Sequence, residues 1–183
     1  MNSPHLKEKE VQSLGVILQN TNRLARLNHA LILLSKIENN RYSDFEMVDI
    51  ATVIDEVLGN FKDLLQLQEI EVQKTYVNPV HIEMSTTLAE ILFANLFQNA
   101  IQYNVEEGFI KIKIENQTVI IANPGEELDV PPEILFKRFK RQSDVEESLG
   151  LGLSIVKRIC ELYEIEVKYL HQAGLHQLIL KLP

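Results

Sequence analysis

Two asparagines four residues apart are the first residues in this sequence whose types and spacing could do chemistry. Asn95 and Asn99 lie beside apolar residues that recur at helical spacing, so both amides would project from one face of a helix. Asparagine is a poor helix former, so a pair at this spacing needs a reason. Amide oxygens are ligands for a hydrated Mg²⁺ that bridges nucleotide phosphates, and a solvated polar stripe is the alternative interpretation.

Two glycines, Gly150 and Gly152, stand directly before a second stretch with helical spacing. The first turn of a helix has unpaired N–H groups and the positive end of the helix dipole, and glycine lets an anion come close to them. The motif is weak by itself, because Ile155 stands where a dinucleotide-binding motif would need a third glycine and no P-loop pattern is present. Taken alone, the glycines indicate a turn before a helix more often than a phosphate site.

The composition restricts the classes of partner. The chain has 18 basic and 26 acidic residues and a formal net charge of -8, so a nucleic-acid partner is not expected. The basic residues are dispersed along the chain except for one cluster, which contains Lys137, Arg138, Lys140 and Arg141. Cys160 lies among apolar residues and is expected to be a buried thiol in a reducing compartment. No apolar run approaches the about 20 residues of a membrane span, so this part of the protein is expected to be cytosolic.

A long helix is predicted at the start of the chain, ahead of one compact domain. Its apolar positions recur at threes and fours: Val11, Leu14, Leu18, Leu24, Leu27, Leu31, Leu34 and Ile37. A helix of about 35 residues cannot bury such a stripe by itself, so it needs a partner helix from a second copy or from sequence outside this chain. The polar segment 41–49 is expected to contain a linker.

The remaining elements follow from periodicity and turn residues. Helices are predicted after Asp49, at 88–103 and from Gly150 to near Tyr163, and strands at 70–72, 80–82, 109–114, 119–122, 166–170 and 175–182. The long polar connection at 123–150 is more typical of a functional lid than of a simple link. This order predicts an α+β fold, a two-layer α/β sandwich with helices on one face of a mixed sheet.

Four motifs in this order resemble a known family. Residues 95–104 resemble its N box, 123–125 a modified G1 box, 136–139 its F box and 150–154 its G2 box. Together they resemble the ATP-binding catalytic domain of sensor histidine kinases, in the group shared with gyrase and Hsp90. The resemblance implies the Bergerat-type ATP-binding fold for residues 46–183. Residues 1–45 are similar to the second helix of the dimerisation and phosphoacceptor hairpin, followed by a linker.

The resemblance also implies which residues contact Mg²⁺ and ATP. The implied nucleotide-binding residues are Asn95, Asn99, Tyr103, Asn123, Gly125, Arg141, Gly150, Leu151, Gly152 and Leu153. Asn99 would be the Mg²⁺ ligand, with Asn95 beside it at the phosphates. Tyr103 would line the adenine pocket, and Arg141 would reach the terminal phosphate. Asn95, Asn99 and Arg141 would be the catalytic residues.

Three positions depart from the family pattern. Asn123 replaces an aspartate that accepts from the adenine amino group, Glu127 replaces a glycine, and Gln102 replaces a frequent lysine or histidine. A hydrogen bond to a charged group contributes about 1.5 to 3 kcal/mol, against roughly 0.5 to 1.5 for a neutral one. ATP binding is therefore expected to persist with reduced affinity.

The phosphoacceptor signature of the family is not found in this sequence. His5, His29, His81, His171 and His176 each lack the acidic residue and the Arg-Thr-Pro-like run that would follow the acceptor. The chain is therefore expected to be a fragment without the first hairpin helix, and its parent is expected to be anchored in the cell inner membrane.

The leading hypothesis is an ATP-dependent protein histidine kinase, present here as its ATP-binding fragment. In the intact homodimer the γ-phosphoryl group would pass to a histidine on the missing helix and then to an aspartate on a response regulator receiver domain. One alternative is a non-catalytic pseudokinase that works as a regulatory interaction module. Another is a serine kinase of the anti-sigma type, which shares the ATP-binding fold but not the long N-terminal helix.

Overall fold

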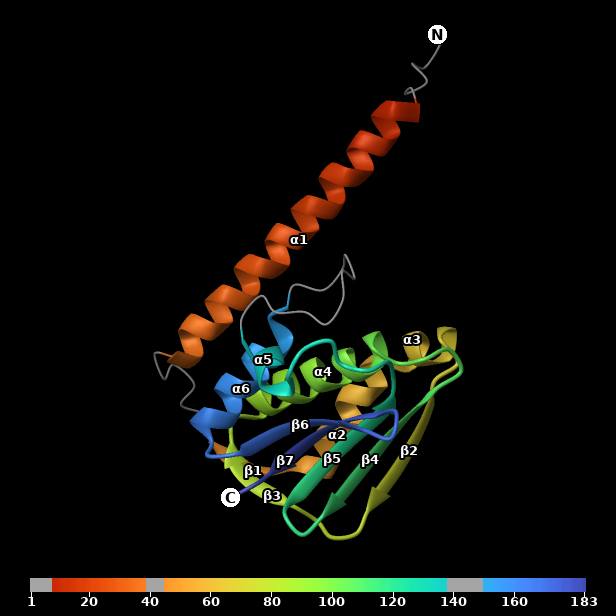
Figure 1. Ribbon diagram of the computed structural model, residues 1–183. Coiled ribbons are helices and arrows are strands. Elements are labelled where there is room, and N and C mark those ends of the chain that lie inside the picture. The colour runs from red at the N-terminus through yellow and green to blue at the C-terminus, as the bar shows by residue number, and fades with distance from the viewer. Residues whose placement is uncertain (1–7, 39–44, 138–149) are drawn as a thin grey trace.

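The computed structural model of the chain describes residues 8–38, 45–137 and 150–183, and it confirms the predicted α+β sandwich (Figure 1). Five strands form a mixed sheet in the order β2-β4-β5-β7-β6. Their bounds are β2 (Glu71–Tyr76), β4 (Phe109–Glu115), β5 (Thr118–Pro124), β6 (Glu166–Gln172) and β7 (Leu175–Lys181). β2 pairs with β4 in parallel, and the other neighbours are antiparallel.

Helices cover one face of this sheet (Figure 1). They are α2 (Ile50–Asn60), α3 (Lys62–Leu67), α4 (Thr86–Gln102), α5 (Pro132–Leu135) and α6 (Gly152–Leu162). α4 contacts both α2 and α6 and therefore lies at the centre of the helical layer. Its apolar residues are buried at helical spacing: Leu88, Ala89, Leu92, Phe93, Leu96, Phe97, Ala100 and Ile101. This burial fixes which face of α4 is left for polar groups.

A short strand lies where only a linker was expected. Glu46–Asp49 forms β1, which pairs antiparallel with β3 (His81–Met84) in a separate two-stranded sheet. Val48 is buried while Met47 is exposed, so the strand alternates too briefly to stand out from its polar surroundings. Asp49 caps α2 as predicted, because its carboxylate accepts from the backbone N–H of Ala51 at 3.1 Å.

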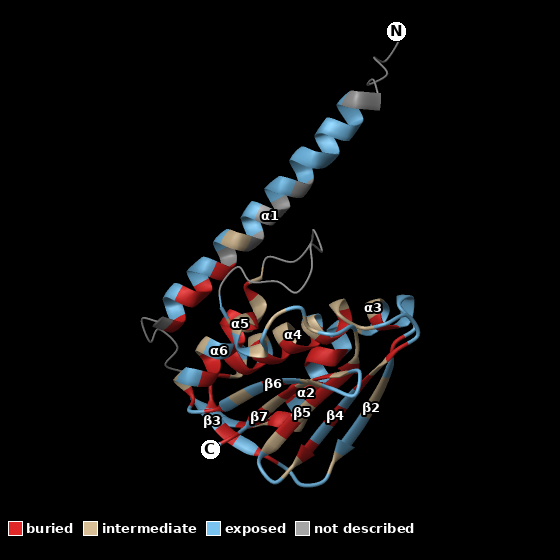
Figure 2. Ribbon diagram, in the orientation of Figure 1, coloured by how far each residue is buried: buried red, intermediate tan, exposed pale blue. Residues whose placement is uncertain are grey.

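The N-terminal helix α1 (Glu8–Glu38) is confirmed, but the domain buries only one end of it. Ala30, Leu33, Leu34 and Ile37 belong to the core, and α1 packs against α6 (Figure 2). The earlier positions of the predicted stripe that are exposed are Val11, Leu14, Leu18, Leu24 and Leu31. None of the helices in the described ranges is both long and apolar enough to cross a membrane.

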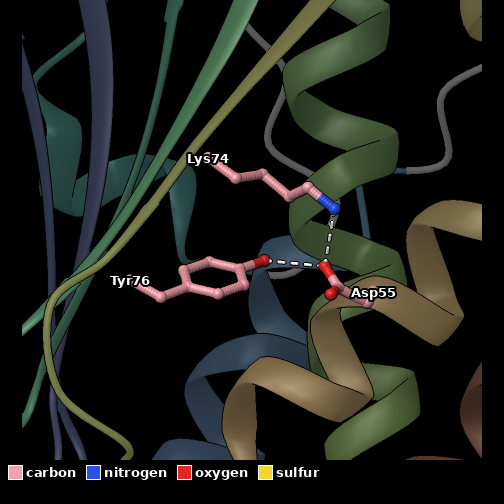
Figure 3. Close-up of polar contacts among 3 residues, drawn as sticks. All are labelled: Asp55, Lys74 and Tyr76. Carbon is pink, nitrogen blue, oxygen red and sulfur yellow. Dashed lines mark hydrogen bonds and ion pairs between the residues drawn. The ribbon is translucent and has the colours of Figure 1, made fainter.

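One ionic contact ties the helical layer to the edge of the sheet. The Asp55 carboxylate on α2 accepts hydrogen bonds from Lys74 Nζ at 2.9 Å and from the Tyr76 hydroxyl at 2.8 Å, both on β2 (Figure 3). Partial burial, together with this carboxylate, raises the pKa of Tyr76 well above its usual range, so the phenol stays a donor. The contact holds an edge strand that has a neighbour on one side only.

Replacing Asp55 is expected to destabilise the domain modestly. Asp55→Ala removes two hydrogen bonds between layers, and because the ion pair is half-exposed the expected loss in free energy of unfolding is about 1 kcal/mol. Glu56→Ala is the control, since Glu56 is the neighbouring acidic residue and is exposed on the same helix. Urea denaturation measures the unfolding midpoint of both variants. Equal midpoints would show that the Asp55 contact contributes nothing to the free energy of unfolding.

Candidate functional site

The predicted asparagine helix and the predicted glycine turn meet in the structure. A Cβ atom added to Gly152, the first residue of α6, would lie 3.0 Å from Oδ1 of Asn95 on α4. The Asn95 amide is fixed from its other end, because Nδ2 donates to the Ile91 carbonyl at 2.7 Å. Glycine at 152 thus lets the start of α6 reach the side chain of Asn95.

The N-terminus of α6 is built to leave backbone donors available. Gly150 has a φ of 64°, a left-handed conformation that favours glycine, and it sets the turn into the helix. Leu151 is buried at the N-cap position, which carries no side-chain cap. The Ser154 hydroxyl donates to the Leu151 carbonyl at 2.8 Å rather than accepting from the first turn. Within the described residues, the first-turn N–H groups at Gly152 and Leu153 therefore have no side-chain cap.

Asn99 lies further along α4, and Tyr103 is the C-cap residue directly after the helix. Asn99 is half-buried, and its amide makes no hydrogen bond to another residue in the described ranges. Its oxygen is thus available as a ligand, which fits a hydrated Mg²⁺. No group of three or more His, Cys, Asp or Glu side chains in the described part of the chain is placed to hold a metal ion. A metal there would depend on Asn99, on water and on oxygens of its own ligand.

Asn123 at the end of β5 is 3% exposed, and its amide orientation is fixed by two carbonyls. Nδ2 donates to the Tyr103 backbone carbonyl at 3.2 Å and to the Pro124 carbonyl at 2.9 Å. Because both partners are acceptors, Oδ1 must be the acceptor end of the amide. Asn123 therefore retains the hydrogen-bonding role of a carboxylate toward a donor, without the charge.

Gly125 follows at a point where the chain passes very close to its neighbours. A Cβ atom there would lie 2.4 Å from ring atoms of His176 and 2.6 Å from the Tyr103 carbonyl oxygen. The Gly125 N–H donates to the Gly174 carbonyl at 3.2 Å, so the segment after β5 is bound to the β6–β7 turn. This glycine is needed for space.

His176 is the residue at this site that sequence reasoning missed. It was considered only as a phosphoacceptor, yet it is 2% exposed and pairs with Asn123 across β5 and β7. Burial, and then the neighbouring His171, lowers the pKa of His176 to about 4, and hydrogen bonding to the Glu126 backbone opposes this shift. The sequence does contain a pattern that predicts this neighbour of His176. His171 and His176 lie at equal distances from the Ala173-Gly174 turn, so they are expected to pair across the two strands.

The structure brings most of the predicted site residues together along α4. Asn95 meets Gly152 at one end, and Tyr103 meets Asn123 and Gly125 at the other. Tyr103 follows Asn95 by eight positions, which corresponds to about 12 Å along a helix. Arg141 lies outside the described residues, and its predicted role stays a prediction.

Comparisons with known proteins agree with this geometry. Residues 84–183 match the family model described as histidine kinase-, DNA gyrase B-, and HSP90-like ATPase. The signal transduction histidine-protein kinase ArlS of Staphylococcus aureus is 30% identical over 161 residues, which are 82% of this chain and 36% of that protein. The chain therefore spans about a third of the length of the curated relatives it matches.

Two solved structures share the fold over nearly the whole chain. The Acinetobacter baumannii histidine kinase AdeS has a TM-score of 0.72 at 25% identity, covering 97% of this chain and 85% of that one. Histidine kinase ThkA, solved in complex with response regulator protein TrrA, has a TM-score of 0.71 at 22% identity. That match covers 100% of this chain and 53% of the other.

Adding a methyl group at Gly125 is expected to be costly. Gly125→Ala places a Cβ against the His176 ring and a backbone carbonyl, so the free energy of unfolding should fall by about 1 to 3 kcal/mol. Gly59→Ala in α2 is the control, because nothing lies within 4 Å and alanine should stabilise the helix by up to about 1 kcal/mol. Thermal unfolding that shifts equally for both variants would contradict the close approach.

Stability should depend on pH through His176. Its pKa is lowered from 6.5 to about 4, so between these values the unfolded chain binds more protons and stability falls as the pH falls. The expected loss is about 2 to 3 kcal/mol, complete near pH 4. His176→Phe should flatten the pH profile of urea unfolding in this window, and the exposed His81→Gln control should not. Parallel profiles for wild type and His176→Phe would contradict the assignment.

Proposed function

Because the chain belongs to the histidine kinase-, DNA gyrase B- and HSP90-like ATPase family, we propose that it binds Mg²⁺-ATP along α4. The phosphates would lie where Gly152 reaches Asn95, and the base would lie about 12 Å away where Tyr103 meets Asn123. The observation that carries this proposal is the Asn95–Gly152 approach, since it joins the amide face of α4 to uncapped backbone donors of α6. Helix N-termini favour anions through those donors and through the dipole.

Each part of the site would have its own task. N–H groups of the first turn of α6 would donate to phosphate oxygens, with Gly150, Leu151, Gly152 and Leu153 forming the turn. Oδ1 of Asn123 would accept from the adenine amino group, because both Nδ2 hydrogens are taken by carbonyls. Asn99 would ligate Mg²⁺, which when bound neutralises charge on the phosphates. Arg141 would reach the terminal phosphate.

We propose further that this ATP site serves a sensor histidine kinase. Sequence kinship with a signal transduction histidine-protein kinase supports it, as does the fold shared with AdeS. Phosphoryl transfer depends mainly on positioning and charge neutralisation, which are the tasks that these residues would perform. The first acceptor would be a histidine on the first helix of the dimerisation hairpin, and the next acceptor would be a response regulator. ThkA was solved in complex with a response regulator protein.

The domain division follows the same proposal. Residues 46–183 would form the ATP-binding domain, and residues 1–45 the second helix of a dimerisation hairpin and its linker. The exposed apolar residues of α1 support this division, because they need a partner helix, either the first helix of such a hairpin or a second copy. Anchoring of a parent protein in the inner membrane stays a prediction from the family resemblance.

Removing the proposed Mg²⁺ ligand should weaken nucleotide binding. Asn99→Ala is expected to lower Mg²⁺-ATP affinity about ten- to a hundredfold in calorimetry, the scale of a lost contact to a charged group. Gln98→Ala, an exposed neighbour on α4, should bind like wild type.

The metal dependence makes this test specific. With EDTA present, wild type and Asn99→Ala should bind ATP with the same affinity, because the Asn99 side chain then has no metal ion to ligate. No binding by wild type at millimolar Mg²⁺-ATP, together with an unchanged melting temperature, would overturn the proposal and favour a non-catalytic regulatory module.

A further inference from the structure

Three polar side chains form a row across the sheet at one end of the proposed ATP site. Asn123 on β5 pairs with His176 on β7, and His176 pairs with His171 on β6. Directly paired residues of antiparallel strands point to the same face, with Cβ atoms about 5 Å apart. Asn123 bonds to the end of α4, so the row lies on the helix-covered face.

The ring of His176 is packed between other rings and the backbone, but its nitrogens make no hydrogen bond of regular geometry in the described residues. The His171 ring lies 4.6 Å away centroid to centroid, and the Tyr169 ring meets it edge-on at 5.9 Å. Gly125 closes over it from another side. Both ring nitrogens of His176 are buried, and although the Glu126 backbone lies close enough to raise the pKa of the ring, neither nitrogen makes a hydrogen bond of regular geometry in the described part of the chain. Buried polar groups are rarely left unpaired, so these atoms point to a ligand or an ordered water.

His176 is neutral at physiological pH, and a neutral imidazole has one donor and one acceptor. The titratable groups around it are Tyr169 and His171 on β6 and Tyr103 at the end of α4, with the backbone of Glu126 close by. His171 also lines a cavity of about 420 Å³ together with Glu127 and Asp129. None of these side chains makes a hydrogen bond with the His176 ring.

We propose that His176 is a positioning residue for the nucleobase, acting directly or through one water at the Asn123 end of the site. This inference rests on the proposed Mg²⁺-ATP site and adds a residue to it. His176 lies in register with the acceptor Asn123 and against the glycine that follows it, at the end of α4 away from Asn95 and Gly152. Its effect should therefore concern the base and leave the phosphates unaffected.

The test compares a ligand that has a base with one that has none. His176→Phe keeps a ring in place but removes both nitrogens, and it should lower Mg²⁺-ATP affinity about three- to tenfold in calorimetry. Binding of Mg²⁺-tripolyphosphate, which lacks the base, should stay unchanged. His176→Gln retains a donor and an acceptor and should recover part of the ATP affinity.

His81→Phe is the control, because it makes the same change at an exposed histidine on β3, outside this row. It should bind both ligands like wild type. Equal ATP affinities for His176→Phe and His81→Phe would overturn the inference, as would a loss that is the same for ATP and tripolyphosphate. If wild type binds neither ligand, the proposed function itself fails, which is a different outcome.

A second measurement covers the case in which His176→Phe does not fold. The ring proton resonances of His176 in the wild-type chain, assigned from the His176→Gln spectrum, should shift on adding Mg²⁺-ATP and not on adding Mg²⁺-tripolyphosphate. Unchanged resonances at saturating ATP would overturn the inference.

Discussion

The fold and the candidate site both depend on the way α4 is buried. Its apolar residues pack between α2, α6 and the sheet, which leaves one narrow polar edge for Asn95, Asn99 and Tyr103. The packing that stabilises the domain therefore also sets the rotation of these side chains about the helix axis. A helix free to rotate would not keep Asn95 against Gly152 and the Tyr103 carbonyl against Asn123.

Two close approaches of backbone and side chain join the remaining elements to α4. At Gly152 the start of α6 reaches the Asn95 amide, and at Gly125 the end of β5 reaches His176 and the Tyr103 carbonyl. Both rely on a missing Cβ, although neither glycine has a positive φ. Space is the constraint here, whereas at Gly150 it is the backbone conformation.

Much of the fold could be predicted from local pattern, because helices and hairpins show their periodicity in a few consecutive residues. The Asn116-Gln117 turn is an example: both residues have positive φ, as a tight hairpin turn between β4 and β5 requires. The strand β1 was missed because four residues with one buried side chain, Val48, carry too little pattern. The surroundings of His176 were missed because they include Asn123 on β5 and Gly125 just after it, which are distant in sequence. The amide orientation of Asn123 depends likewise on a carbonyl at the end of α4.

Only the C-terminal end of α1 is buried in the domain, so the helix can act mechanically as a lever arm. α1 has 31 residues, so as a straight rod it is about 46 Å long. Its last turns are clamped on α6, and the rest projects from the domain with its apolar side chains in solvent (Figure 2). A rigid rod clamped at one end turns a large sideways displacement of its far end into a small tilt at the clamp. Such a tilt would act on α6, whose first residue, Gly152, lies so near the Asn95 side chain that there is no room for a Cβ atom without a shift.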